Sequence, residues 1–395
     1  MAMEPTMNVP HTPVAVPPAL ALAASTVEAV PAPAAPIRAR RALRTYAGTA
    51  GRVIFVIFAL WLFLSSIAIM KDGAVALAPT LHGSALTDSP MSSLGFGWLG
   101  AMFVMSGSPV AVSALAFLHG HVLSATETFT MLTGSRLGAA FVVLTVAFIY
   151  ALRGKQEKKA RHASLSIGIF SLIMTAIVYL PALLIGLPLL RSGALNGVGV
   201  ATSATVLNIV KLLTAPAVHL VEGVVHGPLL FVAGLALLLF SVKLFDRALP
   251  EAAETAHLED HADWRNRRWL MFGIGSLVAL VTMSVSVALT VLVPAVAKGY
   301  FRRRQVLPYI MGANITTLGD TLVTAFVLGN PVGVHVVIAE LIGITSITAL
   351  LLAFCYTPLT ELVVHLTDGI LRTRGRLACF VVALFCIPIV LIWAF

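Results

Sequence analysis

Charged residues are scarce in this chain of 395 residues: they make up 11% of it, whereas a soluble domain carries about 25%. In their place, 58% of the residues are hydrophobic, and runs of about 20 apolar residues follow one another, each long enough to cross a bilayer. This composition excludes a soluble globular domain and predicts an all-α polytopic membrane protein. The net charge of +9 then reflects lysine and arginine in the loops between spans, and it does not indicate a nucleic-acid partner.

Cysteine is also scarce, and the motifs of several enzyme classes are missing. Cys355, Cys379 and Cys386 lie in apolar segments without a CxxC spacing, and we expect them to be small core residues. The sequence has no Walker A, HExxH or GxSxG motif and no cysteine–histidine zinc spacing. An ATP-driven pump or a membrane protease is therefore disfavoured, although the sequence does not exclude an intramembrane enzyme with an unfamiliar motif. We expect no enzyme activity, no cofactor and no metal centre.

The N-terminal region, residues 1–37, is rich in proline and alanine and has no apolar helical run, which predicts a disordered tail. Arginines cluster just after it, ahead of a first span predicted over residues 52–70. Because lysine and arginine are enriched in cytoplasmic segments, this cluster predicts a cytoplasmic N-terminus in a multi-pass protein of the cell (inner or plasma) membrane.

The two halves of the chain contain similar short segments at a nearly constant spacing. Four short segments recur in the same order 175 to 178 residues further on, among them 134–138 (GSRLG) and 312–316 (GANIT). Each loop that is rich in lysine and arginine in one half is poor in them in the other half. Under the positive-inside rule, the two halves then insert upside down relative to one another, as in many secondary transporters.

This pattern predicts the domain organisation. The connector between the halves crosses the membrane once or three times, because both numbers fit the loop charges. The predicted parts are a Pro/Ala-rich cytoplasmic tail (1–37), a first transport repeat (38–190), a connector (191–227), a second, inverted transport repeat (228–376) and a C-terminal transmembrane helix (377–395).

The loop charges also predict a re-entrant hairpin in each half. In the second half, 29 residues (269–297) lie between two basic loops that both read as cytoplasmic, and two full spans would need about 40 residues. Non-helical backbone buried at such a hairpin tip offers free N–H groups to an anion and free carbonyls to a cation. The small residues at the two predicted tips are Ser106, Gly107, Ser108, Ser284 and Ser286.

The most polar stretch within apolar sequence is residues 311–321, MGANITTLGDT. Polar groups at membrane depth cost several kcal/mol each unless they are satisfied, so they usually mark a substrate or ion path. Arg136 lies at the equivalent place in the first half, where it can bind an oxyanion or replace a sodium ion with a fixed charge. The alternative is a structural pair with Asp320, Glu127 or Asp88.

With these residues in hand, the chain resembles the sodium/phosphate cotransporter family over about residues 52–361. That family has two inverted repeats, each with a Gln-Ser-Ser-Ser hairpin followed by a Gly-Ala-Asn-Ile-Gly-Thr-Thr run, and residues 312–315 match this run closely. The chain is similar to a divergent member, because several motif positions differ. The differences are Met105 and Met283 in place of Gln, Gly107 and Val285 in place of the middle Ser, Thr316 in place of Gly, and Arg136 in place of Asn.

The resemblance implies a symporter that moves a small anion, inorganic phosphate, with sodium through a mid-membrane site, and the loss of amide ligands in the motifs leaves protons open as the coupling ion. Its implied partners are the anion and membrane lipids, with sodium as the coupling ion of the family and a homodimer left open. A transporter or exporter of another anion, such as an organic acid or a phosphonate, and a non-transporting sensor or subunit with this fold are the alternatives.

The candidate site residues follow from the two hairpin tips and the two glycine runs. For their hydroxyl groups the alternative is a back-bond within a helix, and for Asn314 it is an interhelical hydrogen bond. Glu340, in a span predicted over 331–354, is a further candidate proton carrier, with a paired structural carboxylate as the favoured alternative. The predicted substrate-binding residues are Ser106, Gly107, Ser108, Arg136, Ser284, Ser286, Asn314, Thr316 and Thr317, and the predicted ion-coupling residues are Asp320, Asn314 and Thr317.

Overall fold

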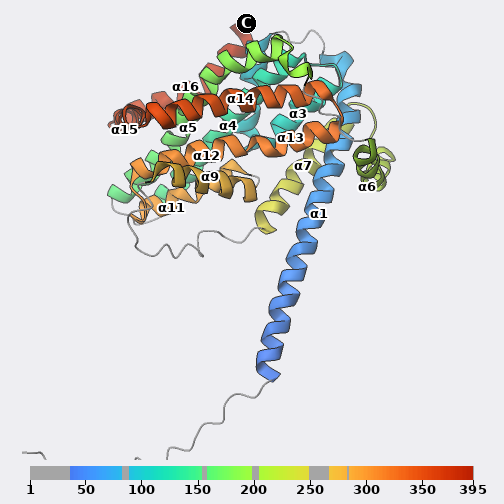
Figure 1. Cartoon of the computed structure of the whole chain (residues 1–395), viewed down its shortest axis with the longest axis horizontal. Coiled ribbons are helices and arrows are strands. Elements are labelled where there is room, and N and C mark those ends of the chain that lie inside the picture. The colour runs from blue at the N-terminus through green and yellow to red at the C-terminus, as the bar shows by residue number, and fades with distance from the viewer. Residues whose placement is uncertain are drawn as a thin grey trace, which may run out of the picture. The chain divides into compact units, whose positions relative to one another are not determined.

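The computed structural model describes residues 36–81, 89–153, 158–197, 204–248, 267–282 and 284–394, which form helices and no strand (Figure 1). The chain divides into two units, 1–53 and 54–395, and every helix after the first lies in the second unit. The helices are α1 (Pro36–Leu81), α2 (Pro90–Val104), α3 (Ser108–His119), α4 (Ala125–Arg153), α5 (Lys158–Arg191), η1 (Ala194–Gly197), α6 (Ala204–Glu222), α7 (Leu229–Ala248), α9 (Arg268–Thr282), α10 (Val285–Thr290), α11 (Leu292–Ala297), η3 (Arg303–Val306), α12 (Leu307–Thr316), α13 (Leu318–Leu328), α14 (Pro331–Phe354), α15 (Tyr356–Leu371) and α16 (Arg374–Ala394).

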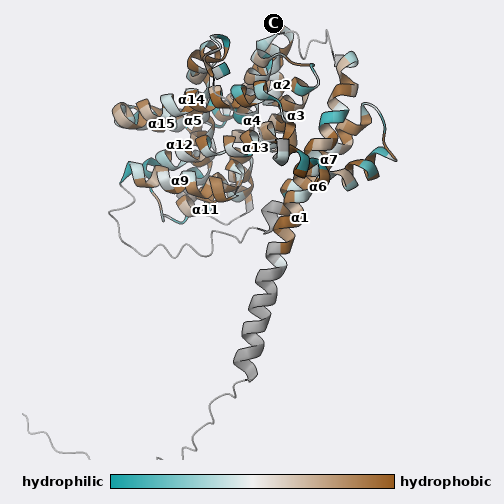
Figure 2. Ribbon diagram, turned by 45° about the vertical axis from the view of Figure 1, so that its right-hand side comes forward, coloured by the Kyte–Doolittle hydropathy of each residue, from teal (hydrophilic) through white to brown (hydrophobic). Residues whose placement is uncertain are grey.

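Six helical segments of the described residues are long and apolar enough to cross a membrane, and most of the ribbon is coloured as hydrophobic in Figure 2. This confirms the predicted all-α polytopic membrane protein. The six segments are Ile54–Thr80, Ala125–Leu152, Ala160–Arg191, Arg303–Leu328, Pro331–Phe354 and Arg374–Ala394. Helix α6 is not among them, and the number of crossings in the connector stays open.

The predicted limits of the helices agree better with the structure inside the chain than at its beginning. Helix α14 starts after Asn330, whose side-chain Oδ1 accepts hydrogen bonds from two backbone N–H groups of the first turn, as the sequence 331–354 predicts. Helix α1 is longer than the predicted span 52–70, because the residues on both sides of that span are mostly good helix formers. The predicted tail lies outside the described residues except for positions 36 and 37, which are helical.

Each half contains a helix break where a hairpin tip is predicted. In the first half α2 ends at Met105, whose φ of 57° is left-handed, and α3 begins with Pro109 in its first turn. In the second half the break lies between α9 and α10, and the hydroxyl of Ser284 caps α10. Helices α2 and α9 have 15 residues each, about 22 Å, which is shorter than the roughly 30 Å apolar core of a bilayer. The lengths support hairpins, whereas their re-entrant topology stays a prediction.

Glycines bring the hairpin helices into backbone contact with the next long helix, at matching positions in the two halves. A Cβ on Gly97 would lie 2.2 Å from the Met131 carbonyl oxygen, and one on Gly275 would lie 2.1 Å from that of Tyr309. Both members of this second contact lie 178 residues after those of the first. The contact of Gly134 with the carbonyl oxygen of residue 94 recurs in the same way between residues 312 and 272. The packing supports the repeat, whereas the opposite orientation of the halves and the domain limits stay predictions.

The expectation of buried cysteines is wrong. Cys355 is half-buried, while Cys379 and Cys386 on α16 are exposed. The cause is that α16 is apolar on all sides, so its hydropathy does not show which face packs inward.

The glycine contacts can be tested on a single helix. We expect Gly275→Ala to lower the thermal midpoint of the purified protein in detergent, since the new methyl group meets a backbone oxygen and overpacking costs about 1–3 kcal/mol. Gly273→Ala, two residues away with open space at its Cβ, is the matched control and should be neutral or stabilising, by up to about 1 kcal/mol. Equal midpoints for the two variants would contradict the close α9–α12 packing.

Candidate functional site

Arg136 of α4 is buried at the centre of the helices and pairs with the start of α13. The residue is about 4% exposed. The Nη2 group donates a hydrogen bond to Thr321 Oγ1 and lies 3.7 Å from Asp320 Oδ1. Asp320 Oδ1 also accepts from the Thr321 backbone N–H (2.6 Å) and from its hydroxyl (3.0 Å). Of the three partners left open by the sequence, Asp320 is the one that Arg136 contacts among the described residues, and Asp88 lies outside them.

This pairing leaves part of the guanidinium unsatisfied. Nε and Nη1 of Arg136 are buried and have no hydrogen-bond partner among the described residues. A buried donor without a partner loses its full solvation energy, about 1–3 kcal/mol and more for a charged group. The free N–H groups therefore fit an anion that binds next to the Arg136–Asp320 pair.

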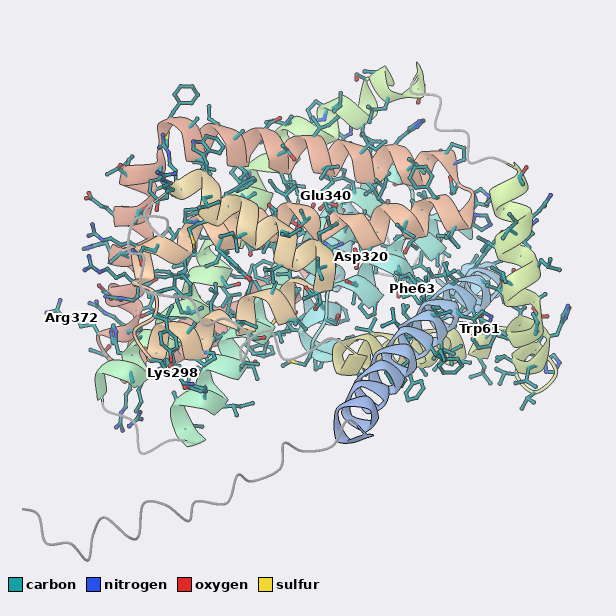
Figure 3. All side chains as sticks on the ribbon, turned by 60° about the horizontal axis from the view of Figure 1, so that its bottom comes forward. Trp61, Phe63, Lys298, Asp320, Glu340 and Arg372 are labelled. Atoms are coloured by element: carbon teal, nitrogen blue, oxygen red, sulfur yellow. The ribbon has the colours of Figure 1, made fainter. Side chains whose placement is uncertain are left out.

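A second buried carboxylate lies on the neighbouring helix α14. Glu340 is about 1% exposed, and its Oε1 lies 3.1 Å from the Thr133 hydroxyl of α4. Its Oε2 has no partner among the described residues. Figure 3 shows Asp320 and Glu340 in the interior, away from the end where Lys298 and Arg372 lie.

Asn314 of α12 contacts α5 of the first half. Its side-chain Nδ2 donates to Thr175 Oγ1 (3.2 Å), and its backbone oxygen accepts from the Tyr179 hydroxyl (2.9 Å). Thr316 and Thr317 donate to carbonyls one turn earlier in their own helix. In this arrangement Asn314 makes a hydrogen bond between helices, and the hydroxyls of Thr316 and Thr317 bond to the backbone of their own helix. These contacts fit the structural roles that the sequence left open beside ligand binding.

The hairpin tips lie against the same long helix as Arg136. Gly107 touches the turn of α4 next to Arg136, since its Cβ would lie 3.0 Å from the Ser135 carbonyl oxygen. In the second half, α10 also packs against α4. The tip side chains of Ser106, Ser108, Ser284 and Ser286 are half-buried.

Several residues of this centre were not selected from the sequence. Thr321 lies within the polar run 311–321, so a signal existed for it, and its hydroxyl links Arg136 to Asp320. Tyr179 is fully buried and lies within electrostatic range of Arg136, Asp320 and Glu340. Neither Tyr179 nor Thr133 belongs to a local motif, so only the fold identifies them.

Apolar helices that enclose one arginine and two carboxylates define a polytopic membrane protein with a polar centre, the arrangement of transporters and channels. Residues 237–386 match the family model described as Na+/Pi-cotransporter. This match confirms, over residues 237–386, the resemblance to the Na+/Pi-cotransporter family that the sequence predicts. No curated protein and no solved structure compared with the chain gave a match.

The buried ion pair of Arg136 and Asp320 can be tested against a partly exposed pair, Arg303 and Asp368. Asp320→Asn leaves the buried Arg136 charge unpaired, and we expect it to lower the unfolding free energy by about 3–5 kcal/mol. Asp368→Asn is the matched control, because Asp368 pairs with Arg303 at a partly exposed site, where solvent screens the pair and it contributes about 0–1 kcal/mol. Thermal unfolding in detergent measures both. A loss for Asp320→Asn no larger than for Asp368→Asn would show that Arg136 does not depend on this carboxylate.

Proposed function

We propose that the chain is a secondary transporter that moves a small anion, inorganic phosphate in the first place, together with a coupling cation. The family of the second half is a transporter family that supports sodium-coupled phosphate transport at family level. The observation that carries the proposal for this chain is the buried Arg136 with its unpartnered N–H groups. Arg136 binds the anion, and the hairpin tips 106–108 and 284–286 provide further contacts.

The buried charges explain why the anion needs a cation. Arg136, Asp320 and Glu340 together carry a net charge of −1 when all three are ionised. Two like charges 4 Å apart repel by about 4 kcal/mol at an effective dielectric constant of 20, which lowers affinity about a thousandfold. An anion therefore binds well only when a cation neutralises one carboxylate. Binding of both species at one centre is the physical basis of symport.

The role of Arg136 can be tested with a variant that keeps its charge. Arg136→Lys retains a cation for Asp320 but loses the N–H groups on Nε and Nη1, and hydrogen bonds to charged groups contribute about 1.5–3 kcal/mol. We expect the half-saturating phosphate concentration for uptake into proteoliposomes to rise at least about tenfold. Arg303→Lys, at the partly exposed pair with Asp368, is the matched control and should transport like the wild-type chain.

The same assay tests the substrate. Labelled phosphate uptake is measured with phosphonates and organic acids as competitors, under a sodium gradient and under a pH gradient. Competition by unlabelled phosphate with the lowest half-inhibitory concentration supports the proposal. Stronger competition by another anion would replace the substrate, and absence of uptake under both gradients, beside an active phosphate transporter in the same vesicles, would refute the transport function.

A further inference from the structure

The Thr133 hydroxyl has more acceptors than it has hydrogens. Its oxygen lies 3.1 Å from the Phe129 carbonyl oxygen and 3.1 Å from Glu340 Oε1. A hydroxyl carries one hydrogen, so it can donate to only one of these two acceptors. If Oε1 of Glu340 carries a proton, it donates to Thr133 while Thr133 donates to Phe129, and all three groups are satisfied. The geometry around Glu340 therefore suits a protonated carboxyl group.

Burial leads to the same result. Glu340 is almost fully buried, and its Oε2 has no partner among the described residues. An ionised carboxylate in an apolar interior needs several hydrogen bonds or a nearby cation, whereas a neutral carboxyl group needs fewer. Asp320 is different, because its Oδ1 has two hydrogen bonds from Thr321 and the Arg136 ion pair. Asp320 therefore has donors that satisfy its oxygen, whereas Glu340 lacks them and can gain and lose a proton.

The charged and titratable groups around Glu340 come from three helices. Helix α14 packs against α3, α4, α5, α12, α13, α15 and η1. Arg136 of α4 and Tyr179 of α5 interact electrostatically with Glu340, and Asp320 of α13 interacts with both of these groups. Of these groups only Arg136 is a cation, and Asp320 already pairs with it. A proton on Glu340 therefore brings the cluster from a net charge of −1 to neutrality.

We propose that Glu340 binds a proton that is moved together with the anion, so that a proton is one of the coupling cations of this chain. The inference rests on the proposed transport function and deepens it. Protonation of Oε1 removes one negative charge from the cluster and admits the anion at Arg136. On the other side of the membrane the anion leaves, the proton returns to water, and Glu340 is ionised again.

Two measurements on purified full-length protein in proteoliposomes test this proposal. The first is exchange of labelled for unlabelled phosphate without any gradient, which needs binding and movement but no net proton transfer. The second is net phosphate uptake driven by a pH gradient at equal sodium on both sides and clamped membrane potential, with a lumenal dye that reports pH. The wild-type chain should perform both.

Glu340→Gln keeps the shape of the side chain but cannot change its protonation. We expect this variant to exchange phosphate at a rate that depends on pH only through the ionisation of phosphate itself, to lose the uptake that the pH gradient drives through residue 340, and to carry fewer protons per phosphate than the wild-type chain. Glu361→Gln, the same substitution at an exposed position of α15, is the matched control and should behave like the wild-type chain.

The outcomes separate the inference from the function on which it rests. If the wild-type chain exchanges no phosphate, the proposed transport of phosphate fails. If the wild-type chain exchanges phosphate and Glu340→Gln still responds to the pH gradient, transport stands and the role of Glu340 is refuted. If Glu340→Gln does not fold, the wild-type chain still tests the inference. Sodium-driven phosphate uptake by the wild-type chain without any response to the pH gradient overturns the role of the proton.

Discussion

One buried charge, the guanidinium of Arg136, constrains the centre of the structure. An unpaired charge among apolar helices would cost about 3–5 kcal/mol, so its counter-ion must come from another helix. The interruption between α12 and α13 places Asp320 and Thr321 in the first turn of α13, where a carboxylate is also favoured by the helix dipole. Such an interruption loses one or two backbone hydrogen bonds of about 1 kcal/mol each. The first half has the continuous helix α4 where the second half has this interruption.

The glycine contacts determine how the rest of each half approaches this charge. Because α2 lies in backbone contact with α4, and α9 with α12, each hairpin stays close to the long helix that follows it. The second arm of each hairpin then reaches the other half, since α3 packs against α13 and α10 packs against α4. Glycines at these few contact positions thus let the hairpin tip at Gly107 lie beside the helical turn of Arg136.

The sequence predicts well what depends on local patterns. Apolar runs mark the long helices, because this signal acts over a few residues, whereas the hairpin breaks were predicted from the loop charges and the internal repeat. It could not choose among three carboxylates for Arg136, nor find Thr175 and Tyr179, which contact Asn314 across 139 and 135 residues of sequence. Such contacts depend on how helices from the two halves cross, and nothing in the local pattern carries that information. The glycine runs indicated the place of the site but not its hydrogen bonds.

The polar contacts of this centre join helices of the first half to helices of the second. Arg136 of α4 contacts Asp320 of α13, Thr133 of α4 contacts Glu340 of α14, and Asn314 of α12 contacts α5. If the halves move relative to one another during transport, these contacts must break or move as a unit. In the proposed mechanism, an anion on the free N–H groups of Arg136 weakens the attraction between the guanidinium and Asp320, and a proton on Glu340 reverses the hydrogen bond to Thr133. In that mechanism the transported species act on the same contacts that join the halves, and a difference in binding energy between two arrangements links their binding to a change of conformation.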